Sequence, residues 1–155
     1  MPDGLYIRMA HFKKYLESEE KKDIKRTLEK IPDRHALLVK DYEIVFQPNN
    51  TLKGSKGHIG LIDEKKKRIT IASPWNYPRE YTLLHEIGHA VWKFILDDDG
   101  KKKWKSLLGR EREKNKRNLG QDDEEIFCMI YAQVYAKNKM KKYENEVLEG
   151  FVRSI

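Results

Sequence analysis

The chain has 155 residues, of which 37% are charged and 39% hydrophobic, and its formal net charge is +7. This length and composition indicate a single globular domain over residues 1–155 with a modest core. No apolar run approaches the ~18 residues that a membrane span needs. The N-terminus lacks the apolar segment of a secretory signal, and a single cysteine, Cys128, excludes an intrachain disulfide. We therefore expect a cytoplasmic protein without a membrane span.

The first half of the sequence predicts one helix and a small β part. Apolar residues at helical spacing predict a helix over residues 17–31. The apolar stretches 36–39 and 42–46 are typical of a strand. Residues 58–62 and 68–72 predict two further strands, joined by a polar connector of hairpin length. We expect a small, mostly antiparallel sheet.

The second half predicts helices only. Helical patterns cover residues 79–96 and 101–117, separated by an Asp-Asp-Asp-Gly run that is expected to stop the first of them. A further helix begins with Asp122 or Asp123 as its N-cap and runs to about residue 139. A last helix covers 143–151. The predicted architecture is therefore α+β, with a small sheet beside several helices.

Positive charge is concentrated in the predicted helix 101–117. Between residues 101 and 118 there are nine Lys and Arg residues and two Glu residues, so this segment carries +7 and the remainder is balanced. Trp104, Leu107 and Leu108 are its inward anchors. Such a helix can attract nucleic acid, an anionic membrane or an acidic protein, or it can be a solvated face with internal Glu–Lys and Glu–Arg pairs. Nucleic acid is the less favoured partner, because no RNA- or DNA-binding motif accompanies the charge.

The helix 79–96 contains the motif His85-Glu86-Ile87-Gly88-His89, which matches H-E-x-x-H. Residues four apart stack on one helix face, so His85 and His89 can bind one tetrahedral Zn²⁺. Glu86 lies about 100° further round the helix, where it can accept a proton from a metal-activated water. Gly88 lacks a side chain, which would allow another backbone to approach closely.

A catalytic zinc also needs a third protein ligand, and no cysteine is near the motif in sequence. The acidic start of the next helix supplies candidates. Glu125 shares a predicted face with Met129, Ala132 and Ala136, and the small alanines favour close packing on the histidine helix. Glu125 is the preferred ligand and Glu124 the second choice. Alternatively, both are ordinary first-turn acids that complement the helix dipole.

Three pieces of the sequence occur in the order seen in one family of zinc peptidases. They are Ser55-Lys56-Gly57, His85 to Val91 with the H-E-x-x-H motif, and Glu125-Ile126-Phe127. With these pieces, the chain resembles the catalytic domain of anthrax lethal factor and its smaller relatives, the clostridial Pro-Pro endopeptidases, over about half its length. The resemblance implies a zincin-type peptidase in which His85, His89 and Glu125 bind zinc and Glu86 is the general base.

The same resemblance implies a mode of substrate binding. The strand that follows Lys56-Gly57, including His58 and Ile59, would line the cleft and pair with an extended peptide. An added strand of this kind gains affinity from main-chain hydrogen bonds and specificity from side-chain pockets. The expected partner is therefore a protein or peptide substrate. The basic helix between His89 and Glu125 favours an acidic one.

Two positions depart from that family. Asn118 stands seven residues before Glu125, where the family has an oxyanion-stabilising tyrosine, and Met129 stands where lethal factor has an acidic residue. The oxyanion donor is therefore open, with four candidates: Tyr77, Tyr81, His58 and Asn118. The remaining histidines, His11 and His35, follow no pattern and are expected at the surface.

Other functions are compatible with the same residues. A second zincin family, the mobile-element peptidase that cleaves a phage-type repressor, also combines H-E-x-x-H with a downstream glutamate in a short chain. The departures at Asn118 and Met129 would also suit a catalytically inactive zinc-binding interaction module. A nucleic-acid-binding protein that uses the basic helix is the third alternative. The zinc endopeptidase is the preferred hypothesis.

Overall fold

The structure, a computed structural model, describes residues 19–46, 60–72, 79–115, 122–136 and 145–155. Over these ranges several helices and a three-stranded mixed sheet form an α+β fold, as predicted. No helix within the described ranges has both the length and the apolar character that a membrane crossing requires.

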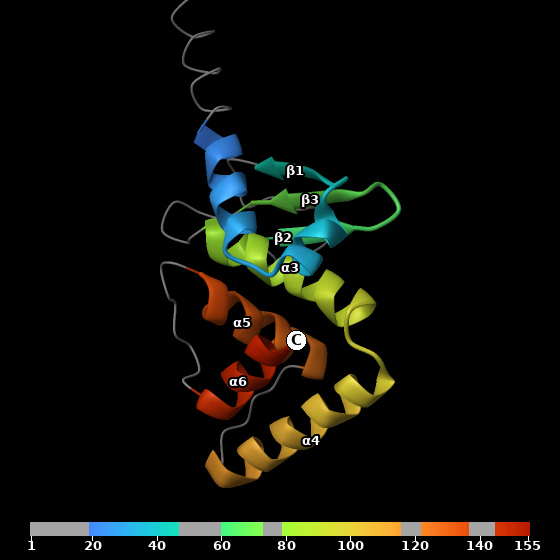
Figure 1. Ribbon diagram of the computed structural model, residues 1–155, viewed down its shortest axis with the longest axis vertical. Helices are drawn as coiled ribbons and strands as arrows, with labels where there is room; N and C mark the ends of the chain where they lie inside the picture. The colour runs from blue at the N-terminus through green and yellow to red at the C-terminus, as the bar shows by residue number, and fades with distance from the viewer. Residues whose placement is uncertain (1–18, 47–59, 73–78, 116–121, 137–144) are drawn as a thin grey trace, which may run out of the picture.

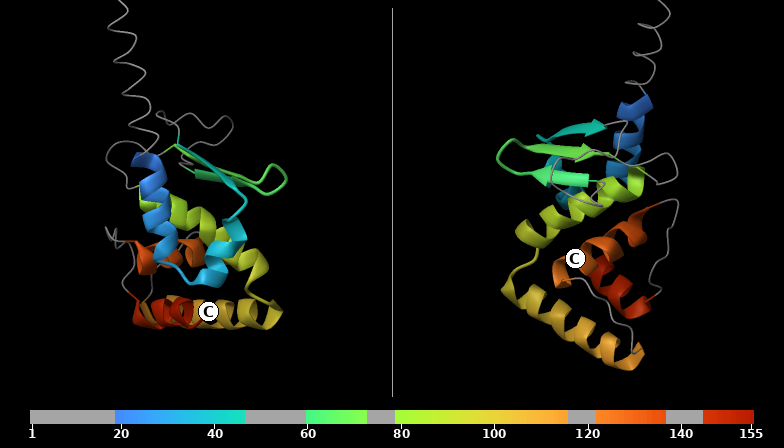
Figure 2. Two further views of the ribbon diagram at one scale, coloured as in Figure 1. Left: turned by 45° about the horizontal axis from the view of Figure 1, so that its top comes forward. Right: turned by 180° about the vertical axis from the view of Figure 1, so that it is seen from behind.

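Helix α3 (Arg79–Phe94) is the central element. The sheet lies on one side of it and α5 (Asp123–Tyr135) packs on the other, which Figure 1 and Figure 2 show from several directions. Helix α6 (Glu146–Ser154) packs on α5, and α4 (Asp98–Asn115) contacts both. The chain therefore places α3 and α5, the two helices that carry the candidate site, directly against each other.

The packing of α3 on α5 depends on a glycine. A Cβ atom on Gly88 would lie 3.0 Å from the Cα of Cys128 on α5. Such a contact is tighter than nine in ten real Cβ contacts, so the expectation that Gly88 permits a close backbone approach is confirmed. On α5, the side chains of Ile126, Phe127 and Ile130 are fully buried.

The basic helix α4 is anchored as its sequence predicts. Trp104 and Leu108 are fully buried and Leu107 is partly buried. The indole ring of Trp104 contacts the rings of Phe127 on α5 and Phe151 on α6, with centroids 5.4 Å apart in both cases. These contacts tie α4 to the other two helices.

The start of α4 differs from the prediction. Helix α3 ends at Phe94, before the Asp-Asp-Asp-Gly run that is expected to stop it. The next helix is expected from Lys101 but begins within the run, with Asp98, Asp99 and Gly100 in the first turn of α4. The reason is a cap: the Asp97 carboxylate accepts a hydrogen bond of 2.7 Å from the Gly100 backbone N–H. Acidic residues in a first turn also interact favourably with the helix dipole.

The sheet consists of β1 (Glu43–Phe46), β2 (Gly60–Asp63) and β3 (Arg68–Ile71) in the order β1-β3-β2. Strands β2 and β3 are antiparallel, but β1 and β3 are parallel. The prediction of a mostly antiparallel sheet is therefore wrong, because the alternation of apolar residues along a strand is the same in either direction. Within the described sheet, β2 is an edge strand.

The segment 36–39, predicted as part of a strand, is helical. It belongs to α2 (Asp33–Ala36) and the 3₁₀-helix η1 (Leu37–Val39). The Pro32 carbonyl oxygen accepts hydrogen bonds from the backbone N–H groups of His35 and Ala36, which starts a helical turn at the proline. Local capping therefore outweighs the apolar run, which fits a buried turn as well as a strand.

His35 is buried, which contradicts its expected place at the surface. Its Nδ1 lies 3.1 Å from the Tyr131 hydroxyl on α5, so a hydrogen bond partner compensates for burial. Burial and the charge of Arg34 lower the pKa of His35 to about 4. His35 is therefore neutral at physiological pH and links α2 to α5.

Candidate metal centre

Helix α3 supplies two neighbouring imidazoles. His85 and His89 lie one turn apart, and their ring centroids are 5.3 Å from each other in an edge-to-face arrangement. Both rings are mostly covered but not fully buried. Buried Leu84, Ile87 and Val91 fix the orientation of the helix, so the two imidazoles face the first turn of α5.

The first turn of α5 is held by three contacts. The Asp122 carboxylate accepts a 2.8 Å hydrogen bond from the Glu125 backbone N–H, so Asp122 is the N-cap, one of the two predicted candidates. From α4, the Trp104 indole N–H donates to the Asp123 carbonyl oxygen at 2.9 Å, and Arg112 pairs with the Asp123 carboxylate at 3.6 Å. This turn therefore has little freedom to move.

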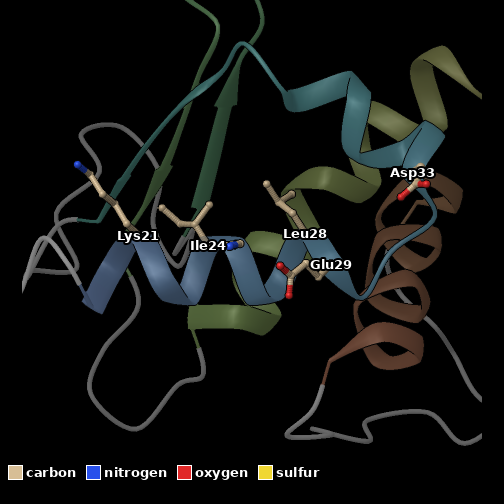
Figure 3. Close-up of a pocket in the computed structure, with 6 residues that line it drawn as sticks. Lys21, Ile24, Leu28, Glu29 and Asp33 are labelled. Atoms are coloured by element: carbon tan, nitrogen blue, oxygen red, sulfur yellow. The ribbon is translucent and has the colours of Figure 1, made fainter.

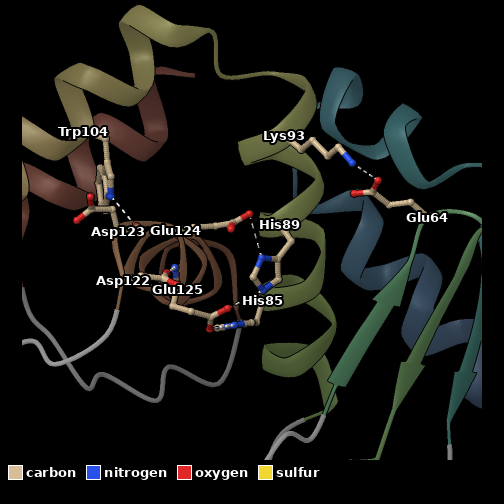
Figure 4. Close-up of polar contacts among 9 residues, drawn as sticks. All are labelled: Glu64, His85, His89, Lys93, Trp104, Asp122, Asp123, Glu124 and Glu125. Carbon is tan, nitrogen blue, oxygen red and sulfur yellow. Dashed lines mark hydrogen bonds and ion pairs between the residues drawn. The ribbon is translucent and has the colours of Figure 1, made fainter. Parts of the chain in front are cut away.

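Glu125 lies between the two histidines. Its Oε2 is 3.1 Å from Nε2 of His85 and its Oε1 is 3.0 Å from Nε2 of His89, as Figure 4 shows. His85 and Glu125 are 40 positions apart in sequence. The fold nevertheless brings the Glu125 carboxylate into contact with both imidazoles. The structure brings together the three side chains that the sequence singled out as metal ligands; metal binding itself remains a prediction.

Glu124 has a different position from the one considered in the sequence. Its Oε1 is 3.4 Å from Nδ1 of His89, on the opposite side of that ring from Glu125 (Figure 4). A carboxylate at the far nitrogen of a metal-binding histidine orients the ring and keeps the proton on that nitrogen. Met129, at the position expected to hold such a group, is buried and apolar. Only the fold shows that the residue before Glu125 faces His89.

The charges in the site reinforce one another. Burial alone lowers the pKa of His89, but the hydrogen bonds that its ring donates to the carboxylates of Glu125 and Glu124, together with the charge of Glu86, raise it to about 9. Hydrogen bonds from His85 and His89 hold the pKa of Glu125 well below its usual range. In the metal-free protein at neutral pH, His89 is therefore a cation paired with a carboxylate. A metal ion must displace that proton.

Glu86, the predicted general base, is buried on the sheet side of α3. A Cβ on Gly60, the first residue of β2, would lie 2.8 Å from Oε1 of Glu86 and 2.8 Å from a methyl group of Thr82. Gly60 therefore leaves the space that the Glu86 side chain occupies. This role of Gly60 was not predicted from the sequence, although a glycine within a strand can mark such a close approach.

Cys128 is a candidate site residue that was not predicted from the sequence. Its Sγ and a nitrogen from each of His85 and His89 all lie within 4.8 Å of one another. The cysteine is distant from the motif in sequence, but it lies three positions after Glu125 and therefore near the same helix face. Burial and the charges of Glu125 and other nearby carboxylates raise the pKa of the thiol, which disfavours the thiolate when no metal is present.

The donor set fits a zinc ion. In a tetrahedral site with Zn–N and Zn–O distances of about 2.0–2.2 Å, neighbouring ligand atoms are about 3.4 Å apart. The observed distances of 3.0 and 3.1 Å between Glu125 oxygens and the two Nε2 atoms are close to this spacing. Two imidazoles and one carboxylate would leave a fourth position for water or substrate.

Most other predicted site residues lie outside the described residues. These are Lys56, Gly57, His58, Ile59, Tyr77 and Asn118. Tyr81 is described: it is buried one turn before His85, with ring centroids 6.5 Å apart. Among the oxyanion donors considered, Tyr81 is thus the one whose ring can be placed beside the histidines.

A shallow, open cavity of about 390 Å³ lies elsewhere, along the helix 19–29 and α2 (Figure 3). It is lined by Lys21, Ile24, Lys25, Leu28, Glu29 and Asp33. None of these residues belongs to the histidine cluster, which consists of His85, His89, Glu124 and Glu125. The cavity therefore adds nothing to the chemistry of that cluster.

Comparisons with models of known protein families, with curated proteins and with solved structures found no match.

Proposed function

We propose that this chain is a zinc-dependent endopeptidase of the zincin type, similar in its site to the lethal factor catalytic domain. One observation carries the proposal. The two imidazoles of an H-E-x-x-H helix and the carboxylate of Glu125 meet within 3.1 Å, although they come from separate helices. If these side chains bound no metal ion, their removal from water between the two helices would be costly.

Each residue of the cluster has a role in this proposal. His85, His89 and Glu125 hold Zn²⁺, and Glu124 orients His89. When bound, zinc supplies an acidified water and polarises the peptide carbonyl. Glu86 takes the water proton as general base and then delivers it to the leaving amine. Gly60 keeps open the space in which the Glu86 carboxylate lies.

The substrate we propose is an extended peptide segment. Strand β2 lies at the edge of the described sheet and contacts α3, and its first residue abuts Glu86. A peptide added along this edge would form main-chain hydrogen bonds close to the general base. Leu61 is largely exposed on β2 and is available to contact the substrate.

An acidic sequence is the preferred substrate. Lys102, Lys103, Lys105 and Arg110 on α4 are exposed, and no ion pair is found for them among the described residues. The same helix contacts the first turn of α5 through Trp104. Unpaired cations on a helix that braces the site would attract acidic residues of a substrate.

The test is cleavage of an unbiased peptide library by zinc-loaded wild type and Glu86→Gln. We expect cuts with wild type alone and equal zinc content in both proteins, because Glu86 is not a ligand. Acidic residues flanking the cut sites would support the role of α4. Cut sites without a preference for flanking acidic residues would exclude that role. Equal cleavage by both proteins would refute Glu86 as the base.

A zinc-binding module without turnover is the second candidate. The buried Cys128 thiol beside the two histidines favours it, because a fourth protein ligand closes a zinc site to water. In that case both proteins would bind zinc and neither would cut the library.

A further inference from the structure

The position of Cys128 depends on Gly88. A Cβ on Gly88 would be 3.3 Å from the Cys128 Sγ and 3.0 Å from its Cα, so a larger residue would displace the thiol. Gly88 lies between His85 and His89 in the motif. The Cys128 thiol is fully buried, whereas the Glu125 side chain that contacts the same two histidines is 34% exposed.

The spacing suits a metal with one sulfur and two nitrogen ligands. Sγ and one nitrogen from each histidine lie within 4.8 Å of one another. In a tetrahedral site with Zn–S of about 2.3 Å and Zn–N of about 2.0 Å, the N···S separation is about 3.6 Å. Small side-chain movements would therefore complete a second three-residue ligand set.

We propose that His85 and His89 serve two alternative ligand sets, with Glu125 for Zn²⁺ and with Cys128 for a thiophilic ion such as Cd²⁺ or Cu⁺. Soft thiolate ligands prefer soft metal ions, whereas carboxylates prefer harder ones. On binding, the metal–sulfur bond replaces the S–H bond and the thiol proton leaves to solvent, with no change of oxidation state. The inference depends on the metal-binding part of the proposed function and not on peptidase activity.

Electrostatics favours a cation at this position. The carboxylates of Glu125, Glu124 and Glu86 act on the thiol and, together with Asp122, make its surroundings negative. A bound divalent cation offsets that potential and stabilises the thiolate. An ion drawn toward Cys128 would also loosen its contact with Glu125, so the two ligand sets are alternatives.

The test is a Cd²⁺ titration of the full chain, monitored through the ultraviolet sulfur-to-metal charge-transfer absorption and by calorimetry. Wild type should give the band at one Cd²⁺ per chain. Cys128→Ala should lack the band and bind Cd²⁺ at least about tenfold more weakly while retaining its Zn²⁺ affinity. Glu125→Gln should keep the band and lose Zn²⁺ affinity. Met129→Ala, the neighbouring buried substitution, is the control for packing and should keep both.

Two results would overturn this proposal. The first is Cd²⁺ binding to wild type without the absorption band. The second is a His85→Ala variant that shows the band and binds Cd²⁺ with unchanged affinity, because the thiol would then bind the ion without the histidines. Circular dichroism melting establishes that each variant folds. Glu86→Gln separates the two proposals, because it should keep the band whether or not the wild type cleaves peptides.

Discussion

Four consecutive acidic residues, Asp122 to Glu125, each have a different partner. The first caps the helix, the second is bound by Trp104 and Arg112, the third faces Nδ1 of His89, and the fourth lies between both histidines. Simple complementation of a helix dipole would not require four distinct contacts. Substitutions at these positions should therefore have separable effects.

Glu124→Gln tests the orienting role. Loss of the charge beside Nδ1 weakens the restraint on the His89 ring, so zinc affinity should fall by about 10- to 100-fold without a large change in stability. Competition with a chromophoric chelator measures the affinity. Glu113→Gln, an exposed acid on α4, is the matched control. Equal affinities in all three proteins would contradict the role.

At the scale of elements, the close contact of α3 and α5 sets the geometry of the cluster. Gly88 provides this contact, and Gly109 on α4 offers a control because a Cβ there would meet nothing within 4 Å. Gly88→Ala should destabilise the fold by about 1–3 kcal/mol, since backbone atoms of Cys128 must move. Gly109→Ala should stabilise it by about 0.5–1 kcal/mol.

Urea unfolding of both glycine variants measures these differences. The prediction for Gly88 also includes weaker zinc binding, because α5 carries Glu125 away from the histidines when it shifts. An alanine at Gly88 that leaves both stability and zinc affinity unchanged would show that the helices do not need their close approach.

The sequence allowed α3, α4 and α5 to be predicted because their apolar stripes and caps are local signals. The direction of β1 and the helical turn after Pro32 were not predictable in this way. Strand direction leaves no mark on alternation, and a short apolar run fits either a strand or a buried turn. The ends of helices depended on individual caps such as Asp97.

The candidate site was predictable to a similar extent. The motif identified His85, Glu86 and His89, and the face of the next helix identified Glu125. The positions of Glu124 and Cys128 relative to the histidines depend on how α5 rotates against α3, which a single sequence does not specify. Tertiary packing determines that rotation.

At the scale of the whole molecule, His35 connects the N-terminal helical part to α5 through Tyr131. Its pKa of about 4 in the fold lies below the ordinary 6.5. His35 therefore binds a proton more readily in the unfolded chain than in the fold. The stability that neutral His35 contributes is fully present above pH 6.5 and is lost as the pH falls toward 4.

Protonation of His35 should lower the free energy of unfolding by about 1.4 kcal/mol per pH unit within that window, or by about 3 kcal/mol in total. His35→Asn, which retains a polar atom near the Nδ1 position, should remove that part of the slope. Urea unfolding at several pH values between 4 and 7 measures it. Parallel pH profiles for the two proteins would exclude His35 as the cause.

The central claim is that two helices bring together a zinc site made of His85, His89 and Glu125. The most direct measurement is zinc stoichiometry and affinity for metal-stripped wild type beside Glu125→Gln, with Glu113→Gln as the control. The account predicts one Zn²⁺ per chain in wild type and control, and an affinity at least about 100-fold lower without the Glu125 carboxylate. A wild type that takes up no zinc, or a Glu125 variant that binds it equally well, would contradict the account.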